Sequence, residues 1–411
     1  MTSTYEERPA GGAAPAEQRE TVPAAEGPVH EAAERRTAAS RLPSLTGLRF
    51  IAAALVFAFH AGLFGVFRDA GVQEGFQFGT SAAGFVGVSF FFVLSGFVLT
   101  WSSRTGDTAP RFWRRRFVKI LPNHVVTWAV ALVLIAWLGG RSVGFGPAVA
   151  NLFLVHAWVP DITYAASVND VSWSLSAEAL FYLAFPALAF AASKIRPGRL
   201  WYWAGGLAAT ALLMPVVSQF LLPDEPQFMW GTASFTQIWF VYYSPVIRAL
   251  EFALGILLAR IVLTGRWVGL GVLPATALAV GAYIGALYVP FLYRFASVTA
   301  LPLALLVGAV AVADIKGKRG ILSSRPLVWL GEISFAFYLV HKLVLEYGRV
   351  PFGSALTPQG LMGPVWSTPG GIAFLAGALA VSVVLAWGLH VGVERPALRR
   401  WGRSRRGEES S

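Results

Sequence analysis

The chain has 411 residues, of which 55% are hydrophobic and only 13% are charged, and its mean hydropathy is +0.58. A soluble domain carries about 25% charged residues, so this composition excludes an ordinary soluble protein and predicts a membrane protein. The net charge of +11 does not indicate a nucleic-acid partner, because the basic residues form short clusters between long apolar runs. The chain has no cysteine, which excludes disulfide bridges, zinc-thiolate sites and a thiol nucleophile, and we expect no metal ion.

Both ends of the chain are polar. Residues 1–40 are rich in Ala, Glu and Pro and have too few apolar side chains to form a core, so we expect a disordered cytoplasmic tail. No signal peptide is expected there, because the first apolar run begins too late. Residues 399–411 form a second tail, basic at first and then acidic and serine-rich. These limits leave 41–398 as the predicted membrane domain.

Apolar stretches within 41–398 are long enough for transmembrane helices, which need about 20 mostly apolar residues. The stretches lie near 45–67, 83–101, 120–138, 171–193, 200–221, 241–263, 267–290, 296–313, 327–347 and 371–393. The stretch 296–313 is short, and Asn151–Val159 is a candidate for a segment that enters the membrane without crossing it. We therefore expect an all-α, polytopic membrane protein with about ten transmembrane helices.

The basic residues indicate how these helices are oriented. An even number of helices puts both termini on the same side of the membrane. If that side is the cytoplasm, most of the lysines and arginines between helices also fall inside, in the segments 104–119, 194–199, 260–266 and 316–319. This asymmetry follows the positive-inside rule, so both termini are predicted to be cytoplasmic.

A few ionisable side chains fall inside the apolar stretches, where they are costly and indicate function. Arg49 and His60 are 11 residues apart, which places them on one helix face roughly 16 Å apart along the axis. Glu178 and His341 are predicted to lie in the outer half of the membrane, at a depth similar to His60. A histidine can act as a general base, and a nearby carboxylate can orient it. Structural roles stay open for each, such as hydrogen-bonded packing or an ion pair.

A basic segment runs from Arg114 to Lys119 and ends before Pro122. A spacing of three residues puts Arg116 and Lys119 on one side of a helix start, where they can bind phosphates together with Arg49. Alone, this segment would be interpreted as a positive-inside anchor. The combination of a cytoplasmic phosphate-binding surface and a base deeper in the membrane fits a coenzyme A thioester.

These motifs, taken together, resemble the acyltransferase 3 family of membrane acyltransferases over about 41–398. In chain order the matching pieces are Ser44–Arg49 with His60 (Arg-x10-His), Gly84–Phe97, the basic segment up to Pro122, Trp173–Glu178 with Tyr182, Arg248–Gly255, Gly331–His341 and Glu394–Pro396.

The resemblance implies transfer of an acyl group, usually acetyl, from cytoplasmic acyl-CoA to a hydroxyl, often on a sugar. It implies that Arg49 and His60 are the key pair, that Arg116 and Lys119 are the paired basic positions and that Glu178 is the site carboxylate. Lys119 stands where arginine is usual, and lysine cannot make the same bidentate phosphate contact.

The acceptor site is expected to contain aromatic and polar side chains from the same motifs. The candidates for binding the acceptor are Trp173, Ser176, Tyr182 and His341. Trp101 and Tyr338 are further candidates for aromatic faces against a sugar ring or macrocycle, although any one of these aromatic residues can also be an interfacial anchor or a packing residue. Without an appended hydrolase-like domain, the chain resembles stand-alone members of the family, and its lysine-poor composition resembles that of high-GC actinobacterial proteins. We therefore expect an enzyme of a bacterial cell membrane that acylates a glycosylated or macrolide-type metabolite.

Two alternatives remain open at this stage. O-Acetylation of a cell-envelope polysaccharide uses the same chemistry on a polymeric acceptor. A proton-coupled transporter or exporter is the alternative from another class, because intramembrane His and Glu side chains also relay protons. A transporter would require discontinuous helices with paired Gly or Pro breaks near the middle of the membrane, and no symmetric pair is seen. The acyl chain length and the oligomeric state stay open.

The predicted orientation can be tested with reporter fusions. A reporter active only in the cytoplasm should be active when fused at residue 110 and after the last helix, and a reporter active only outside should be inactive there. Activity of the external reporter at residue 110 would overturn the topology.

Overall fold

The computed structural model describes residues 1–4, 42–103, 107–138, 142–228, 233–353, 355–357 and 360–402. The chain divides into two units, Met1–Ser40 and Arg41–Ser411. Residues 1–4 of the first unit form no helix or strand. The rest of the predicted N-terminal tail, and residues 403–411 of the predicted basic tail, lie outside the described residues.

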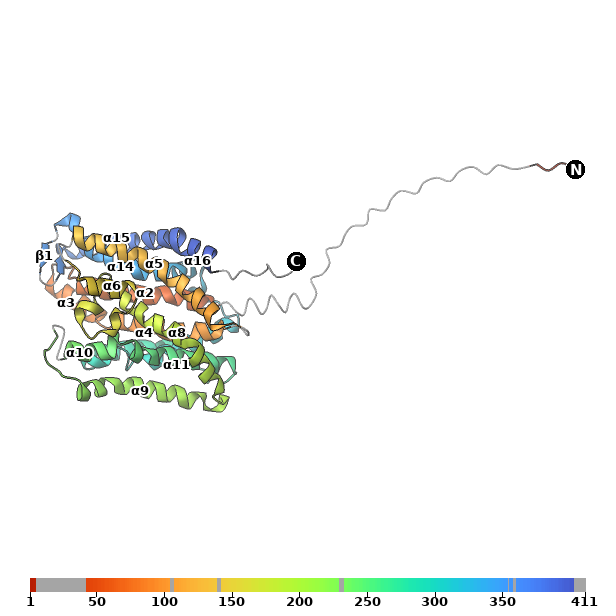
Figure 1. Ribbon diagram of the computed structural model, residues 1–411, viewed down its shortest axis with the longest axis horizontal. Coiled ribbons are helices and arrows are strands. Elements are labelled where there is room, and N and C mark those ends of the chain that lie inside the picture. Colours follow the sequence, from red (N-terminus) through yellow and green to blue (C-terminus); the bar gives the residue numbers. More distant parts are fainter. Residues whose placement is uncertain are drawn as a thin grey trace. The chain divides into compact units, whose positions relative to one another are not determined.

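The second unit is built from helices that run side by side (Figure 1). The longer helices are α2 (Pro43–Leu63), α3 (Ala70–Thr80), α4 (Ala83–Trp101), α5 (Ala109–Trp137), α6 (Phe145–Leu152), α8 (Trp173–Lys194), α9 (Leu200–Leu221), α11 (Pro245–Leu263), α12 (Val272–Tyr288), α13 (Ala300–Ile315), α14 (Arg325–Tyr347) and α15 (Thr368–Leu389). Shorter turns are η1 (His156–Trp158), α7 (Ile162–Ala165), η2 (Asp170–Ser172), η3 (Pro197–Arg199), α10 (Phe235–Ile238), η4 (Trp239–Tyr243), η5 (Phe291–Arg294), η6 (Ile321–Ser323), η7 (Val350–Phe352), η8 (His390–Glu394) and α16 (Arg395–Trp401). The strands β1 (Ala355–Thr357) and β2 (Gly360–Met362) form a short antiparallel hairpin. The other elements of the described residues are all helical, so the predicted all-α class is confirmed.

Within the described ranges, seven helical segments are long and apolar enough to cross a membrane. They contain α2, α4, α5, α8, α9, α14 and α15. The other three predicted stretches also contain helices, but α12 and α13 have only 17 and 16 residues, and α11 carries Arg248, Glu251 and Arg260. The chain is thus a multi-pass membrane protein, and the predicted count of ten spans is not confirmed.

Large apolar side chains face outward on the helices at the edges of the bundle. In Figure 1, α9 and α15 form opposite edges, and both expose large apolar side chains, among them Tyr202, Leu213 and Phe220 on α9 and Val384 and Trp387 on α15. Exposed apolar surface of this extent would be unfavourable in water but is suited to contact with lipid.

Helix α5 begins earlier than the sequence predicted. The apolar stretch was expected from residue 120, whereas the helix starts at Ala109. Pro110 suits the first turn of a helix, and Arg111–Ile120 contains no helix breaker. The basic residues Arg116 and Lys119 therefore project from a continuous helix that also packs on α8 and α14.

Polar side chains hold the connection between α5 and α8 in the interior. Asn151 is fully buried, and its amide nitrogen donates to the Ser167 carbonyl oxygen at 2.7 Å. The imidazole of His124 on α5 contacts the Asn151 carbonyl oxygen at 3.0 Å. This connection, which includes the predicted Asn151–Val159 segment, is packed against α5 and α8.

Helix α4 is central to the bundle and contacts α2, α11 and α13. Its closest approach is to α11, where two glycines face the opposite backbone. A Cβ atom at Gly96 would lie 2.0 Å from the Phe252 carbonyl oxygen, and one at Gly255 would lie 2.0 Å from the Val93 carbonyl oxygen. Small residues allow helix backbones to pack this closely in membranes, so the glycines set the distance between α4 and α11.

This close contact predicts that Gly255→Ala destabilises the protein. The added methyl group must push the backbones apart, and overpacking of this kind costs about 1–3 kcal/mol. The melting temperature in detergent should fall by several degrees.

Gly205→Ala on α9 is the matched control, because a Cβ there would meet no atom of the described residues within 4 Å. Alanine is the better helix former by about 1 kcal/mol, so this variant should be neutral or stabilised. Equal melting temperatures for the two variants would contradict the assignment.

Candidate functional site

Two hollows in the helix bundle share part of their walls. The first, here called the basic hollow, has a volume of about 100 Å³ and is lined by Arg49, Arg116, Lys119, Glu178 and Tyr182 together with apolar residues of α4. The second, the aromatic hollow, has a volume of about 60 Å³ and includes Ser174, Phe92 and Tyr338 in its lining. Arg49, Phe91, Glu178 and Phe335 line both. The two hollows are therefore neighbours around the Arg49–Glu178 position.

The basic hollow collects charges from three helices. Arg49 comes from α2, Arg116 and Lys119 from α5, and Glu178 from α8. Lys119, Arg49 and Arg116 are the charged neighbours that act on Glu178. Opposite charges attract strongly where little water is present. Glu178 thus lies among the cations.

Further polar groups brace the wall of the basic hollow. The Tyr182 hydroxyl forms a hydrogen bond with Glu178, and the Trp113 indole nitrogen donates to the Tyr182 carbonyl oxygen at 3.0 Å. Arg116 also stacks over Phe112, with its guanidinium carbon 5.5 Å from the ring centroid. These contacts fix the carboxylate and one cation relative to α5 and α8.

A second carboxylate, which does not line the basic hollow, partly balances the charge of its cations. Glu394, in η8, is within electrostatic reach of Arg49 and Lys119. It accepts a hydrogen bond from the Asn123 amide at 3.1 Å and lies 3.1 Å from the His390 ring. The sequence resemblance marked Glu394 only as part of a motif, and its position near Arg49 is decided by the packing of η8 on α5.

Hydrogen bonds connect the aromatic hollow to the start of α8. The Ser174 hydroxyl donates to the Tyr338 hydroxyl at 2.9 Å, and the Tyr338 hydroxyl donates to the Val171 carbonyl oxygen at 3.0 Å. Tyr338 also contacts Phe91 edge to face, at 6.2 Å between ring centroids. Ser174 was not among the predicted site residues, although it lies in a motif that the sequence analysis identified, whereas Tyr338 was expected as an aromatic face of the acceptor site.

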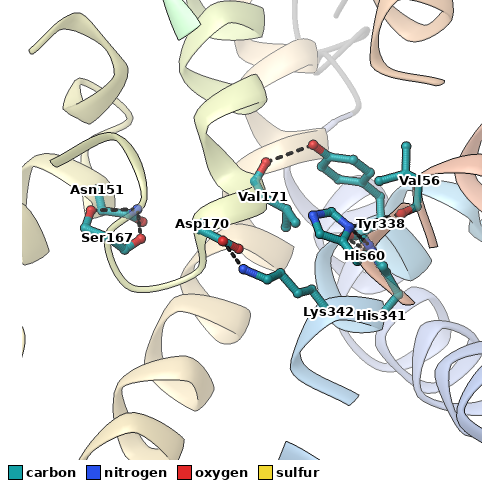
Figure 2. Close-up of polar contacts among 9 residues, drawn as sticks. All are labelled: Val56, His60, Asn151, Ser167, Asp170, Val171, Tyr338, His341 and Lys342. Atoms are coloured by element: carbon teal, nitrogen blue, oxygen red, sulfur yellow. Dashed lines mark hydrogen bonds and ion pairs between the residues drawn. The ribbon is translucent and has the colours of Figure 1, made fainter. Parts of the chain in front are cut away.

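His60 lies beside His341. Figure 2 shows the two imidazoles, from α2 and α14, with Tyr338 next to them. His60 Nδ1 is 3.0 Å from His341 Nε2, and His341 Nδ1 is 2.8 Å from the Tyr338 carbonyl oxygen. The rings of Tyr338 and His341 are 5.8 Å apart. Tyr338 thus connects the histidine pair to the aromatic hollow.

An ion pair fixes α14 near these histidines. Lys342, which follows His341, pairs with Asp170 in η2 (Figure 2). The Asn169 amide donates to the Leu339 carbonyl oxygen at 3.0 Å. These contacts attach the residues before α8 to the same turn of α14 that carries His341.

The other two predicted acceptor-binding residues serve packing in this structure. Trp173 is buried against the rings of Phe92, Tyr242 and Tyr243. Ser176 is fully buried, and its hydroxyl donates to the Leu154 carbonyl oxygen at 2.6 Å. Neither side chain lines the two hollows.

A buried ion pair supports the aromatic hollow from behind. Arg248 and Glu251 on α11 are both almost fully buried, and their charged atoms are 3.0 Å apart. Arg248 also donates to the Ser89 hydroxyl at 3.2 Å and stacks over Phe92, with 5.0 Å to the ring centroid. An Arg and a Glu three residues apart in an apolar run are a signal for such a pair.

Comparison with known proteins identifies the family. The profile described as "Acyltransferase domain" matches residues 42–390. Acyltransferase MdmB of Streptomyces mycarofaciens is 43% identical over 371 residues, which cover 89% of this chain and 94% of that protein. The chain belongs to the acyltransferase 3 family, as the motifs predicted.

More distant relatives differ in length. Peptidoglycan O-acetyltransferase OatA of Listeria monocytogenes is 28% identical over 75% of this chain, but the match spans only 50% of OatA. Exopolysaccharide production protein ExoZ of Rhizobium meliloti is 30% identical over 79% of this chain and 92% of its own length. No solved structure matches.

Proposed function

We propose that this protein is an integral-membrane O-acyltransferase that moves an acetyl or other short acyl group from acyl-CoA to a hydroxyl of a sugar or a glycosylated, macrolide-type metabolite. The observation that carries the proposal is the continuity of the site. A hollow lined by three cations shares walls with a hollow whose Tyr338 contacts the His60–His341 pair. This arrangement suits a donor with a charged head and a reactive thioester at the other end.

The cations bind the donor in this proposal. Arg116 and Lys119 hold phosphates of acyl-CoA, because charge-assisted hydrogen bonds to phosphate are strong. Arg49 lines both hollows and is the cation nearest the thioester arm, where it offsets negative charge that develops in the reaction. Glu178 keeps Arg49 and Lys119 oriented, and Tyr182 contributes to the wall beside them.

His60 is the general base. As the acceptor oxygen attacks the thioester carbonyl, His60 takes the hydroxyl proton and a new C–O bond forms. The C–S bond then breaks, its electron pair goes to sulfur, and the protonated His60 returns the proton to give free coenzyme A. The products are an ester and a thiol, so atoms and charges balance. Removal of a general base typically costs ~10²–10⁴-fold in rate.

The acceptor is proposed to be a small amphipathic molecule. The aromatic hollow is narrow and is formed by side chains inside the helix bundle, which a folded protein surface would not enter. Phe92 and Tyr338 provide aromatic surface of the kind that binds sugar rings or apolar macrocycles. Trp173 packs behind Phe92, and Ser176 fixes the adjacent loop. A hydroxyl is favoured over an amine because it arrives uncharged.

The membrane arrangement is part of the proposal. We infer ten crossings with both termini in the cytoplasm, a membrane domain over 41–398 between tails at 1–40 and 399–411, and residence in a bacterial cell membrane. The ten helices that coincide with the ten apolar stretches support the count, and the basic residues on the first turns of α5 support the orientation.

The proposed O-acyltransferase activity predicts that the purified protein transfers acyl groups. In lipid nanodiscs with acetyl-CoA, the wild type should acetylate glycosylated small molecules, detected by mass spectrometry as an added acetyl mass. His60→Ala should fold normally and lose at least ~10²-fold in rate. Transfer only to polymeric or lipid-linked glycan would contradict the small-molecule acceptor and support acetylation of a cell-envelope polysaccharide. An active His60→Ala variant would show that His60 is not the general base.

The donor site predicts a separate change in the Michaelis constant. Arg116→Gln and Lys119→Gln should each raise the KM for acetyl-CoA by roughly 10–100-fold, since a hydrogen bond to a charged group contributes ~1.5–3 kcal/mol. The KM for the acceptor should change little.

Lys119→Arg should keep donor affinity or improve it, because arginine binds phosphate with two hydrogen bonds. Lys194→Gln, at an exposed lysine near the end of α8, is the control and should leave both constants unchanged. Unchanged donor affinity in both glutamine variants would assign the cations to membrane anchoring.

A further inference from the structure

The proton positions on the His60–His341 pair follow from the groups around the rings. His341 Nδ1 lies 2.8 Å from the Tyr338 carbonyl oxygen and 3.2 Å from that of Phe337. A carbonyl oxygen only accepts hydrogen bonds. His341 Nδ1 is therefore the protonated nitrogen.

The other nitrogen of His341 then acts as an acceptor. His341 is fully buried, and burial of an unpaired charge is costly, so its ring is neutral and carries a single proton. His341 Nε2 consequently holds a lone pair, and it is directed at His60 Nδ1 at 3.0 Å.

His60 is fixed in turn. Its Nδ1 faces two acceptors, His341 Nε2 and, at 3.0 Å, the Val56 carbonyl oxygen of its own helix. Both interactions require a proton on Nδ1. Neutral His60 therefore carries its lone pair on Nε2, and among the residues that the structure describes Nε2 has no hydrogen-bond partner.

The surrounding residues keep His341 in this orientation. Its ring stacks on Phe337, with 5.7 Å between centroids and 10° between planes. The Asp170–Lys342 pair and the Asn169 hydrogen bond to Leu339 anchor the same turn of α14. His341 has no exposed surface, so it acts on the reaction through His60 and does not contact the acceptor.

We propose that His341 is a positioning residue that holds His60 in the Nδ1-protonated tautomer, so that His60 Nε2 is the atom that takes the acceptor proton. The role of His60 Nε2 as the proton acceptor rests on the proposed function, whereas the tautomer itself does not. When His60 becomes doubly protonated, the His341 lone pair and the Val56 carbonyl oxygen both still accept from Nδ1–H. His341 thus performs for His60 the orienting role that a carboxylate has in other base-catalysed sites.

The tautomer can be measured without any substrate. The full-length protein is labelled with ¹⁵N-histidine in nanodiscs, and magnetic resonance distinguishes protonated from unprotonated ring nitrogens. The chain has six histidines, and His60→Gln identifies the His60 signals. We expect a protonated Nδ1 and an unprotonated Nε2 at His60. A proton on Nε2, or an evenly mixed population, would overturn the proposal whether or not the protein is active.

Two substitutions separate positioning from packing. His341→Leu removes one of the two acceptors and leaves only the Val56 carbonyl oxygen to favour a proton on His60 Nδ1, so the Nε2-protonated form of His60 should become populated. His341→Gln retains an acceptor oxygen near the position of Nε2 and should preserve the wild-type signals. His124→Gln, at a buried histidine that contacts Asn151 instead, is the control and should leave His60 unchanged. A His60 spectrum unaffected by His341→Leu would reduce His341 to a packing residue.

Kinetics with acetyl-CoA and a glycosylated small molecule that the mass-spectrometry assay detects as an acceptor provide the second arm. His341→Leu should lower kcat by ~10²-fold or more, toward the ~10⁴-fold that loss of the orienting residue costs in a serine protease, with little change in KM for acetyl-CoA. His341→Gln should recover most of the rate. The double variant His60→Ala/His341→Leu should be no slower than His60→Ala, because His341 acts only through His60. Additive losses would contradict the proposal, whereas an inactive wild type with the expected tautomer would reject the function alone.

Discussion

Charged side chains within an apolar helix bundle need partners, because little water is present to solvate them. Each buried charge of the described structure is placed by this constraint. Arg248 pairs with Glu251 inside α11, and Arg349 donates to the carbonyl oxygens of Phe64 and Gly65 after α2 and of Pro364 before α15. Arg49 is within electrostatic reach of the carboxylates of Glu178 and Glu394. The interactions of Arg49 connect α2 to α8 and η8, and those of Arg349 connect the end of α14 to the segments after α2 and before α15.

The same constraint shapes the site. Three cations around the basic hollow are only partly balanced by Glu178 and Glu394, which leaves positive charge for an anionic donor while keeping the helices together without it. The two histidines instead form hydrogen bonds to backbone carbonyl oxygens and to each other. The cations are thus separated from the base, with Tyr338 and Phe91 between them. This separation suits a long donor that is held at one end and reacts at the other.

Close backbone packing keeps this arrangement rigid. The reciprocal contacts of Gly96 and Gly255 bring α4 against α11, and α4 supplies Phe91 and Phe92 to the aromatic hollow. Phe92 in turn carries Arg248 on its face. A shift of α4 by the width of one methyl group would therefore move both the wall of the hollow and the ion pair behind it.

The sequence by itself determined the membrane class, most of the long helices and the family, and it singled out Arg49, Arg116, Lys119, Glu178 and His60 as candidates, because hydropathy and short motifs depend on local sequence. It did not determine which of these side chains meet. Glu178 joined the cations and His341 took the place beside His60, since contacts between α2, α8 and α14 depend on helix rotation and depth, which a linear pattern does not encode. Glu394 and Tyr338 were brought to the site in the same way. Only the tertiary structure could decide that Trp173 and Ser176 pack behind the hollows, because that choice depends on how the buried connection before α8 folds against them.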